Sequence, residues 1–426
     1  MRPAPPAISI IDVNSCYVSI ELLFKPWLRN RACIVLSNND SACVARNSHA
    51  KALGIRMGQP WHEIAHLVRS GQVHAFSSCY ELYQDMSNRI MAVLATQAPR
   101  IEVYSIDEAW LDLSGLPESE YAAWGRDVRD TVLRQVGIPV GVGIGPTKTL
   151  AKLANWAAKT WAPKTGWVVD LSDPCRQARL LKLAPVEEVW GIGPRLTRRL
   201  ADMGVKTAWE LAKMDARLLR RIFGVTVERT ARELAGERCF EVGESPGPKQ
   251  MIAATRSFGR KITRYEDIAA AIATHTVRAA AKLRAQGSLC QCLQVFARTS
   301  AFAKQGQSYS GQRIVALPCP TDDSRTLVSA ALEGLAHLYR EGPRYAKAGI
   351  VLSQFVAGDR YTPDLFAPPP RPKSHDLMRA MDAINAKMGR ATVRLAREDA
   401  GHGWQMRREL LSPRYTTVWE DLAPAG

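Results

Sequence analysis

Three features typical of membrane, secreted and zinc-containing proteins are missing from this sequence. No apolar run approaches the roughly 18 residues of a membrane-spanning helix, and the N-terminus lacks the apolar stretch of a signal peptide. The cysteines number nine, an odd count, and none forms a Cys-x-x-Cys pair. This pattern excludes a zinc or disulfide framework. We therefore expect a reduced, cytoplasmic, soluble protein.

Acidic residues are few compared with basic ones, since 41 Asp and Glu face 57 Lys and Arg and give a formal charge of +16. Such an excess predicts a polyanionic partner, with nucleic acid as the first candidate and an acidic membrane surface as the second. The 426 residues, 46% of them hydrophobic, suffice for about three domains with buried cores.

Two stretches match catalytic motifs only in part. In "GVGIGPTKT" (141–149), Pro146 stands where a dinucleotide loop has its third glycine, and Thr147 where a P-loop has glycine. We expect these glycines to let a strand pack closely against the next helix, whose Lys148, Lys152 and Lys159 are phosphate candidates. "HEIAH" (62–66) has the zinc-protease spacing, but the segment between Pro60 and Gly71 is too short for the helix of that site.

Two adjacent acids interrupt a strand-like segment, "RIEVYSIDEAWLDLSGL" (100–116). If its two halves form a hairpin, Asp107 and Glu108 lie at the tip, and Asp12 at the end of another strand can join them. Three carboxylates without His or Cys are ligands for Mg²⁺, and two such ions are typical of phosphoryl transfer. Acids at a hairpin tip are also often plain solvated turn residues, so the spacing leaves both readings open.

A second motif is "VWGIGPRLTRRLADMG" (189–204). Gly191 and Gly193 allow a tight hairpin before a helix that carries Arg195 and Arg198. A glycine hairpin that exposes backbone amides beside a helix N-terminus is a phosphate site. The segment resembles the helix-hairpin-helix motif, which binds the DNA backbone without reading sequence. The alternative is an ordinary connection between two helices.

The segment 249–360 alternates in the order strand, helix, strand, strand, helix, strand, which predicts a small βαββαβ domain. It holds sixteen Lys and Arg against seven Asp and Glu, a local charge of +9. This bias favours a surface that follows a phosphate backbone over a merely solvated face.

With these motifs in hand, the chain resembles the Y-family translesion DNA polymerases, and within them the UmuC type, the catalytic subunit of bacterial DNA polymerase V. The likeness extends from residue 8 to the end. It rests on these stretches: "DVNSCYVSIE", "VLSNNDSACVARNSHAKALGIRMGQPW", "FSSCYELYQDMSNR", "VYSIDEAWLDLSG", "VGVGIGPTKTLAKLANWAAK", "VWGIGPRL" and "WQMRRELLSPRYTT".

The resemblance implies an α+β multidomain fold, the right hand of a polymerase. The expected parts are a ferredoxin-like catalytic palm (1–25 and 75–174), small fingers (26–74), a helical thumb with the helix-hairpin-helix (175–240), a linker (241–248), a βαββαβ little finger that binds DNA (249–360), a Pro-rich linker (361–375) and a UmuC-type tail (376–426).

The resemblance also implies roles for single residues. Asp12, Asp107 and Glu108 would bind two Mg²⁺ ions, together with the backbone carbonyl of Val13. Tyr17 matches the steric gate that excludes the 2′-OH of ribonucleotides. Lys51, where many relatives have Arg, and Lys159 match the family's positions that hold the incoming triphosphate.

The implied reaction is error-prone, lesion-bypassing addition of dNTPs to the primer 3′-OH of a primer–template DNA, in SOS-type damage tolerance. In the Pro-rich linker, Leu365 and Phe366 match the end of a sliding-clamp peptide, although Thr362 stands where Gln is expected. The tail implies a UmuD′-like dimer and a recombinase filament as partners. The alternatives are a non-catalytic DNA-binding protein and a structure-specific nuclease with two metal ions.

Overall fold

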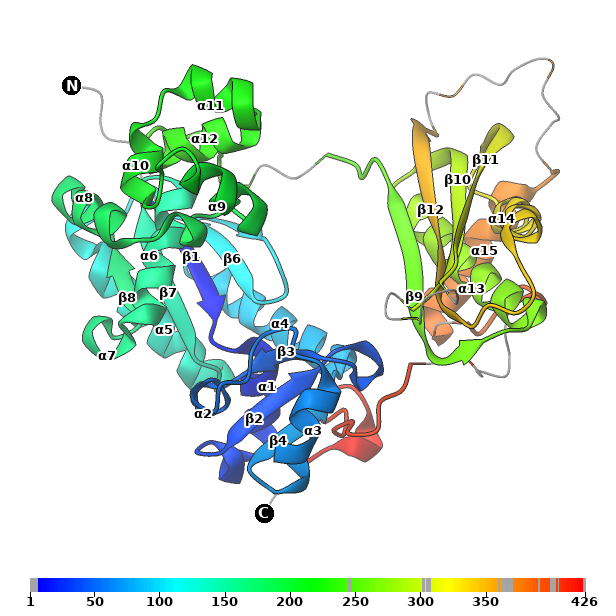
Figure 1. The fold of residues 1–426 in the computed structure, drawn as a ribbon, viewed down its shortest axis with the longest axis horizontal. Coiled ribbons are helices and arrows are strands. Elements are labelled where there is room, and N and C mark those ends of the chain that lie inside the picture. Colours follow the sequence, from blue (N-terminus) through cyan, green and yellow to red (C-terminus); the bar gives the residue numbers. More distant parts are fainter. Residues whose placement is uncertain are drawn as a thin grey trace. The chain divides into compact units, whose positions relative to one another are not determined.

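The computed structural model describes residues 7–243, 247–300, 303, 308–358, 361, 366, 371–389, 391–398, 404 and 406–423. The chain divides into two compact units (Figure 1). The first consists of Met1–Ser37, Ser41–Ser245 and Leu410–Gly426, and the second of Asn38–Asp40 and Pro246–Glu409. Within the described part of the chain, no helix has both the length and the apolar character needed to cross a bilayer.

The main sheet of the first unit has the strand order β5-β6-β1-β7-β8. Its central strand β1 (Ile8–Val13) runs antiparallel to both neighbours, β6 and β7. The order of the first four strands is that of a ferredoxin-like sheet, as predicted. The other strands are β5 (Arg100–Val103), β6 (Glu108–Asp112), β7 (Val140–Gly145) and β8 (Val168–Asp170).

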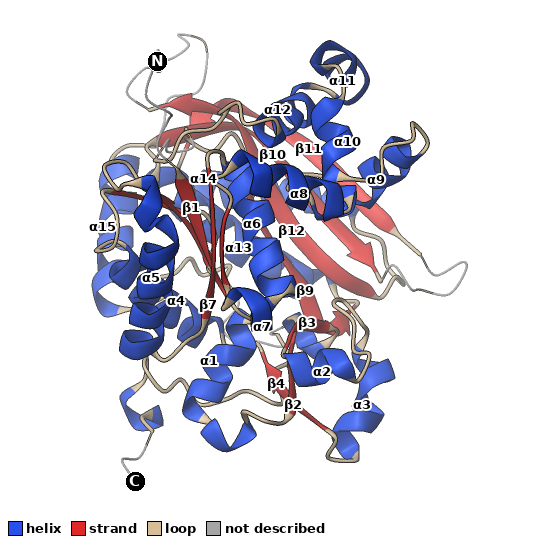
Figure 2. Ribbon diagram, turned by 90° about the vertical axis from the view of Figure 1, so that its left-hand side faces the viewer, coloured by secondary structure: helices blue, strands red, loops and turns tan. Residues whose placement is uncertain are grey.

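Helices cover both faces of this sheet, with α4 (Tyr80–Leu94) and α5 (Tyr121–Val136) on one face and α6 (Lys148–Thr160) on the other (Figure 2). Strand alternation divides the apolar residues of β1 accordingly. Ile11 and Val13 join the core on the α4–α5 side, and Ile8 and Ile10 join Trp110 and Ala151 on the α6 side. Asp12 has the same parity as Ile10 and therefore belongs to the α6 face.

Helix α6 lies directly on β7 because three glycines leave no side chain between them. A Cβ on Gly143 would lie 2.2 Å from the carbonyl oxygen of Ala151 and 2.4 Å from the backbone nitrogen of Asn155. This contact confirms that the glycines of 141–145 serve close packing of strand against helix.

A smaller sheet of the first unit has the order β3-β2-β4, with β2 parallel to β4 and antiparallel to β3. The HExxH pattern lies on the nine-residue helix α3, where His62 and His66 are exposed. The elements here are α1 (Cys16–Phe24), β2 (Ala32–Leu36), β3 (Cys43–Arg46), α2 (Ser48–Ala52), α3 (Trp61–Arg69) and β4 (Val73–Ser77).

A helical subdomain follows the main sheet, as predicted for a thumb. It is attached through Glu233, a fully buried carboxylate that accepts hydrogen bonds from the backbone nitrogens of Thr149, Cys239 and Phe240. The helices are α8 (Pro174–Leu183), α9 (Pro194–Ala201), α10 (Ala208–Lys213), α11 (Ala216–Phe223) and α12 (Val225–Leu234). The short helix α7 (Ala162–Thr165) instead belongs to the main sheet, where it connects α6 to β8.

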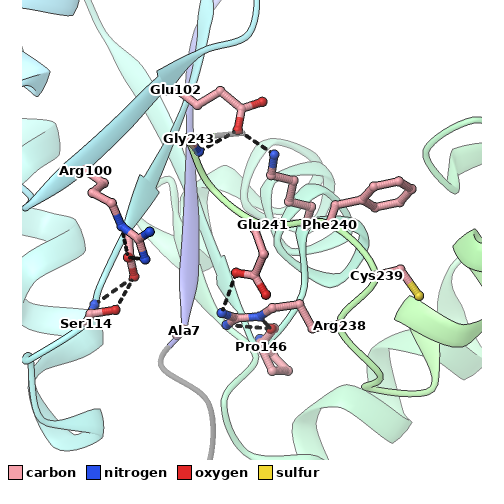
Figure 3. A network of polar contacts seen from close by, with 12 residues as sticks. Ala7, Arg100, Glu102, Ser114, Pro146, Arg238, Cys239, Phe240, Glu241 and Gly243 are labelled. Atoms are coloured by element: carbon pink, nitrogen blue, oxygen red, sulfur yellow. Dashed lines mark hydrogen bonds and ion pairs between the residues drawn. The ribbon is translucent and has the colours of Figure 1, made fainter. Parts of the chain in front are cut away.

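The chain that leaves this subdomain is held on the main sheet. Arg238 donates to the carbonyl of Pro146 and pairs with Glu241, and the backbone nitrogen of Gly243 donates to Glu102 at 3.1 Å (Figure 3). The expected linker from residue 241 is therefore fixed at its beginning.

The second unit has a four-stranded antiparallel sheet in the order β11-β10-β12-β9. Its chain order confirms the βαββαβ prediction, and α13 and α14 enclose its core. Helix α15 is attached by the ion pair Arg284–Asp382. The elements are β9 (Ile252–Ile262), α13 (Tyr265–Ala285), β10 (Ser288–Thr299), β11 (Ser310–Thr321), α14 (Ser324–Leu338), β12 (Tyr345–Ala357) and α15 (Ser374–Met388).

His275 on α13 is buried in this second core, with its ring edge-on to Trp404. Its Nε2 atom has no hydrogen-bond partner among the described residues. Burial, reinforced by the charges of Arg278 and Arg256, lowers the pKa of His275 from 6.5 to about 3.

We predict that the second unit loses stability as the pH falls from 6.5 toward 3. In this range the unfolded chain protonates His275 and the folded chain does not, so acid favours the unfolded state by about 1.4 kcal/mol per pH unit. Substituting His275→Phe removes this titration and should flatten the pH dependence of the unfolding temperature in calorimetry of the full chain. The exposed His337→Gln should keep the original dependence, and an unchanged slope in His275→Phe would contradict the prediction.

Candidate active site

Two of the predicted acids lie side by side on adjacent strands. Asp12, the second-last residue of β1, is paired in register with Glu108, the first residue of β6. Both carboxylates are mostly buried, with 15% of each side chain exposed. The hairpin of β5 and β6 thus brings Glu108 to Asp12 on the α6 face, as the sequence pattern predicts.

Helix α6 places three polar side chains against these acids. The Lys159 ammonium lies 2.5 Å from Asp12, and that of Lys152 lies 2.5 Å from Glu108. The amide of Asn155 donates to Asp12 at 3.1 Å. The spacing of 152, 155 and 159 puts all three on one face of the helix. Burial first, and then the neighbouring Asp12, raises the pKa of Glu108 against the opposing hydrogen bond from Lys152.

The third acid, Asp107, bonds within its own turn. Its carboxylate accepts a hydrogen bond from the Ser105 hydroxyl, and its backbone carbonyl accepts one from the nitrogen of Val13 at 2.9 Å. Among the residues that the structure describes, no three His, Cys, Asp or Glu form a cluster that could hold a metal ion. The structure therefore brings Asp12 and Glu108 together but leaves Asp107 turned toward Ser105.

The donor set nevertheless fits a hard cation. Asp12 and Glu108 offer carboxylate oxygens, the ligands that Mg²⁺ prefers. The ammonium groups of Lys152 and Lys159 now supply positive charge opposite these oxygens. Close by, Asn155 Oδ1 and both polar atoms of the Asn14 side chain are buried without a partner among the described residues. Orphaned oxygens beside paired acids indicate a site built for further polar ligands.

A group of cations extends the site beyond Lys159. Desolvation, followed by the charges of Arg46 and Lys159, lowers the pKa of Lys51. The Nε atom of Arg46 is buried and has no hydrogen-bond partner in the described part of the chain. Asn47 caps α2 and also bonds the backbone of β2, which holds Lys51 beside this strand. Three cations that repel one another are suited to a polyanion.

Tyr17 projects from the first turn of α1 and is half-buried. Its ring stacks on that of Tyr83 at 4.5 Å and meets Tyr80 edge-on at 6.3 Å. Burial first, and then Tyr80, raises the pKa of Tyr17 to about 12. The ring is therefore neutral and is held against two other tyrosine rings.

The glycine hairpin has the predicted form. Gly191 has a φ of +87°, where a side chain would strain the backbone, and Gly193 precedes the first residue of α9. Both glycines, Arg195 and Arg198 are exposed. The two glycines and the two arginines are thus open to solvent, which a phosphate-binding hairpin requires.

Sequence reasoning missed Arg46, Tyr83 and Asn155. Of these, only Asn155 could have been identified from the sequence, because it lies three residues after Lys152 and four before Lys159 on one helix and so shares their face. The clamp-peptide prediction stays untested, since Leu365 lies outside the described residues and Phe366 is 96% exposed.

Family models match most of the chain. The impB/mucB/samB family model matches residues 11–156, and the model of its C-terminal domain matches residues 249–365. A third model, for a domain of unknown function, matches residues 375–425.

Individual relatives cover nearly the whole length. The chain is 45% identical to protein UmuC of Salmonella typhimurium, over 97% of this chain and 99% of the relative. It is 28% identical to DNA polymerase IV of Moorella thermoacetica, over 93% and 97% of the two chains. A solved Y-family DNA polymerase chimera of Dbh and Dpo4 is only 20% identical but has the same fold, with a TM-score of 0.63 over 82% of this chain and 99% of the chimera.

These matches confirm the predicted right-hand fold and the predicted activity, that of an error-prone DNA-directed DNA polymerase in DNA damage tolerance. Y-family polymerases depend in general on divalent metal ions, which agrees with the carboxylates of the site. The chain belongs to the impB/mucB/samB family of Y-family translesion DNA polymerases and is similar to UmuC throughout its length.

Proposed function

We propose that this site adds dNTPs to the 3′-OH of a primer on template DNA, with Asp12, Asp107 and Glu108 as its catalytic acids. The observation that carries the proposal is the pairing of Asp12 with Glu108 beneath a row of cations. Acids and cations on one buried face can hold a metal-bound triphosphate and balance its charge.

Two Mg²⁺ ions would be held by the carboxylates of Asp12, Glu108 and Asp107 and by the backbone carbonyl of Val13. When bound, the ions lower the pKa of the attacking 3′-OH and neutralise charge on the phosphates. For the acids to hold the ions, Lys152 and Lys159 would release Glu108 and Asp12 and turn to phosphate oxygens, and the Asp107 carboxylate would leave Ser105.

Lys159, Lys51 and Arg46 are proposed to bind the triphosphate. Arg46 offers a buried N–H that has no partner among the described residues, and Lys51 and Lys159 offer ammonium groups that repel each other until an anion separates them. Electrostatic binding of this kind positions the phosphates without covalent chemistry by the protein.

Tyr17 is proposed as the steric gate against ribonucleotides. Its ring is held from behind by Tyr83, so it cannot retreat from a sugar 2′-OH without losing the stack. No titration of Tyr17 is needed for this role, because its pKa of about 12 keeps it neutral.

DNA binding is proposed to combine the hairpin of Gly191, Gly193, Arg195 and Arg198 with the basic second unit. Neither reads sequence, since amides and guanidinium groups contact phosphates. The domain boundaries given above for palm, fingers, thumb and little finger are retained as part of this proposal, except that β4 (Val73–Ser77), which pairs with β2, extends the fingers from residue 74 to residue 77.

The partners other than DNA and dNTP rest on the resemblance to UmuC alone. They are a UmuD′-like dimer and a recombinase filament for the tail, and a sliding clamp for Leu365 and Phe366. We propose a cytoplasmic location, which a DNA substrate in a bacterial cell supports.

We predict that Asp107→Ala combined with Glu108→Ala abolishes primer extension. The loss should be at least about a thousandfold, because the several kcal/mol that metal ions contribute in such sites require their carboxylates. Single-nucleotide extension measures the loss, and binding to primer–template DNA should persist. The pair Asp127→Ala and Asp130→Ala, which removes two exposed acids of α5, is the matched control. Extension that survives the active-site pair would refute the assignment.

Tyr17→Ala is predicted to raise ribonucleotide incorporation relative to deoxyribonucleotide incorporation by about tenfold or more, because a steric clash is worth a few kcal/mol. The readout is the ratio of kcat/KM for a dNTP to that for the matching rNTP. Tyr17→Phe keeps the ring and should keep the ratio. A ratio unchanged in Tyr17→Ala would show that another residue selects the sugar.

A further inference from the structure

Glu21 is a fully buried carboxylate at some distance from the chemistry, and no step of the reaction uses it. It lies on α1, one turn beyond Tyr17. Its Oε1 atom accepts a hydrogen bond from the Tyr83 hydroxyl at 2.8 Å, and Lys25 Nζ approaches Oε2 at 3.1 Å. A buried charge persists only where its oxygens are paired, so the partners of Glu21 matter to its neighbours.

The remaining partner comes from the far end of the chain. The Ser412 hydroxyl donates to Glu21 Oε2 at 2.5 Å and accepts from Lys25 Nζ at 2.7 Å. Ser412 is itself only 5% exposed. Its hydroxyl therefore closes a buried network of one acid, one ammonium group and two hydroxyls.

The segment that carries Ser412 is docked on both sides of this residue. We call residues 410–423 the C-terminal segment. Before Ser412, the backbone of Leu410 exchanges hydrogen bonds with Ser77, at 2.9 Å each. After it, the Tyr415 ring stacks on Phe24 at 4.4 Å. These contacts fix Ser412 over Glu21.

The same network reaches the nucleotide side of the site through Tyr83. This ring is fully buried and stacks on that of Tyr17, with 4.5 Å between the ring centroids. The hydrogen bond to Glu21 fixes the hydroxyl end of Tyr83. A continuous series of contacts thus joins Ser412, Glu21, Tyr83 and Tyr17.

We propose that Ser412 is a positioning residue for sugar selection, through which the C-terminal segment holds Tyr17 in place by way of Glu21 and Tyr83. The proposal rests on the proposed role of Tyr17 as the steric gate. It gives a function to part of residues 375–425, the region that matches the family model of a domain of unknown function.

The physical reason is the cost of an incompletely paired buried acid. Without the Ser412 hydroxyl, Glu21 keeps Lys25 but loses one donor, and the carboxylate turns toward the ammonium group or admits water. Tyr83 then loses its fixed acceptor, and the ring behind Tyr17 gains freedom. A Tyr17 ring that Tyr83 no longer holds in place excludes the 2′-OH less well, although the ring still collides with it when it is in its original position.

The test is the sugar-selectivity ratio, kcat/KM for a dNTP divided by kcat/KM for the matching rNTP, measured on the full-length chain. Partial misfolding lowers both values equally and cancels in the ratio. We expect Ser412→Ala to lower the ratio by about threefold or more, and Ser412→Thr, which keeps the hydroxyl, to restore it. Tyr83→Phe should act in the same direction, because it breaks the next link while keeping the ring.

The double variant Ser412→Ala with Tyr83→Phe should be no worse than the more impaired single variant, since both substitutions interrupt one series of contacts. Arg414→Ala is the control within the C-terminal segment. It removes the ion pair with Asp421 but touches no member of the network, and it should leave the ratio unchanged.

The outcomes separate this inference from the gate on which it rests. If Tyr17→Ala lowers the ratio but Ser412→Ala and Tyr83→Phe do not, the network is refuted and the gate stands. If Tyr17→Ala has no effect, the gate itself is wrong. If Arg414→Ala lowers the ratio as much as Ser412→Ala, the segment acts by general stabilisation and the positioning role of Ser412 is refuted. If Ser412→Ala does not fold, the sugar-selectivity ratio of Tyr83→Phe alone decides whether the network supports the gate: a lowered ratio supports it and an unchanged ratio refutes it.

Discussion

The polar face of the active site depends on how closely α6 lies on β7. At Gly143 the strand and helix backbones approach so closely that a single methyl group would overlap the carbonyl of Ala151. Only glycine permits this distance. It brings Lys152, Asn155 and Lys159 to the two acids across the sheet, so the packing of one strand sets the electrostatics of the site.

Four acids in the first unit are held by cations or donors that come at least in part from other segments of the chain. Glu108 and Asp12 depend on α6, Glu233 on the backbone of α6 and of residues 239–240, and Glu21 on Lys25, Tyr83 and the C-terminal segment. The active-site acids and Glu21 differ in how firmly their partners are held. The lysines opposite Asp12 and Glu108 have long, flexible stems and can release them, whereas the hydroxyls around Glu21 are fixed by their own packing.

Much of the fold and part of the active site were predictable from local sequence patterns. Alternation and turn residues gave the β5–β6 hairpin and the βαββαβ order, and family motifs gave the roles expected of Asp12 and Tyr17. Contacts between distant segments were not predictable, because periodicity carries no information about them. Arg46 is an ordinary strand-end residue in sequence, Asp107 bonds to its own turn, and Ser412 lies 391 positions from Glu21. Only the folded chain brings these groups together.

The most direct test of this account is the dNTP KM of Gly141→Ala in primer extension. A Cβ at this position would lie 2.8 Å from Asn155 Oδ1 and 3.3 Å from Lys159 Cε, both in side chains that can move, so the fold should persist. Displacing these groups from Asp12 should raise KM by about fivefold or more, with an unfolding temperature near that of the original protein. An unchanged KM would contradict the claim that close packing of α6 on β7 sets the site.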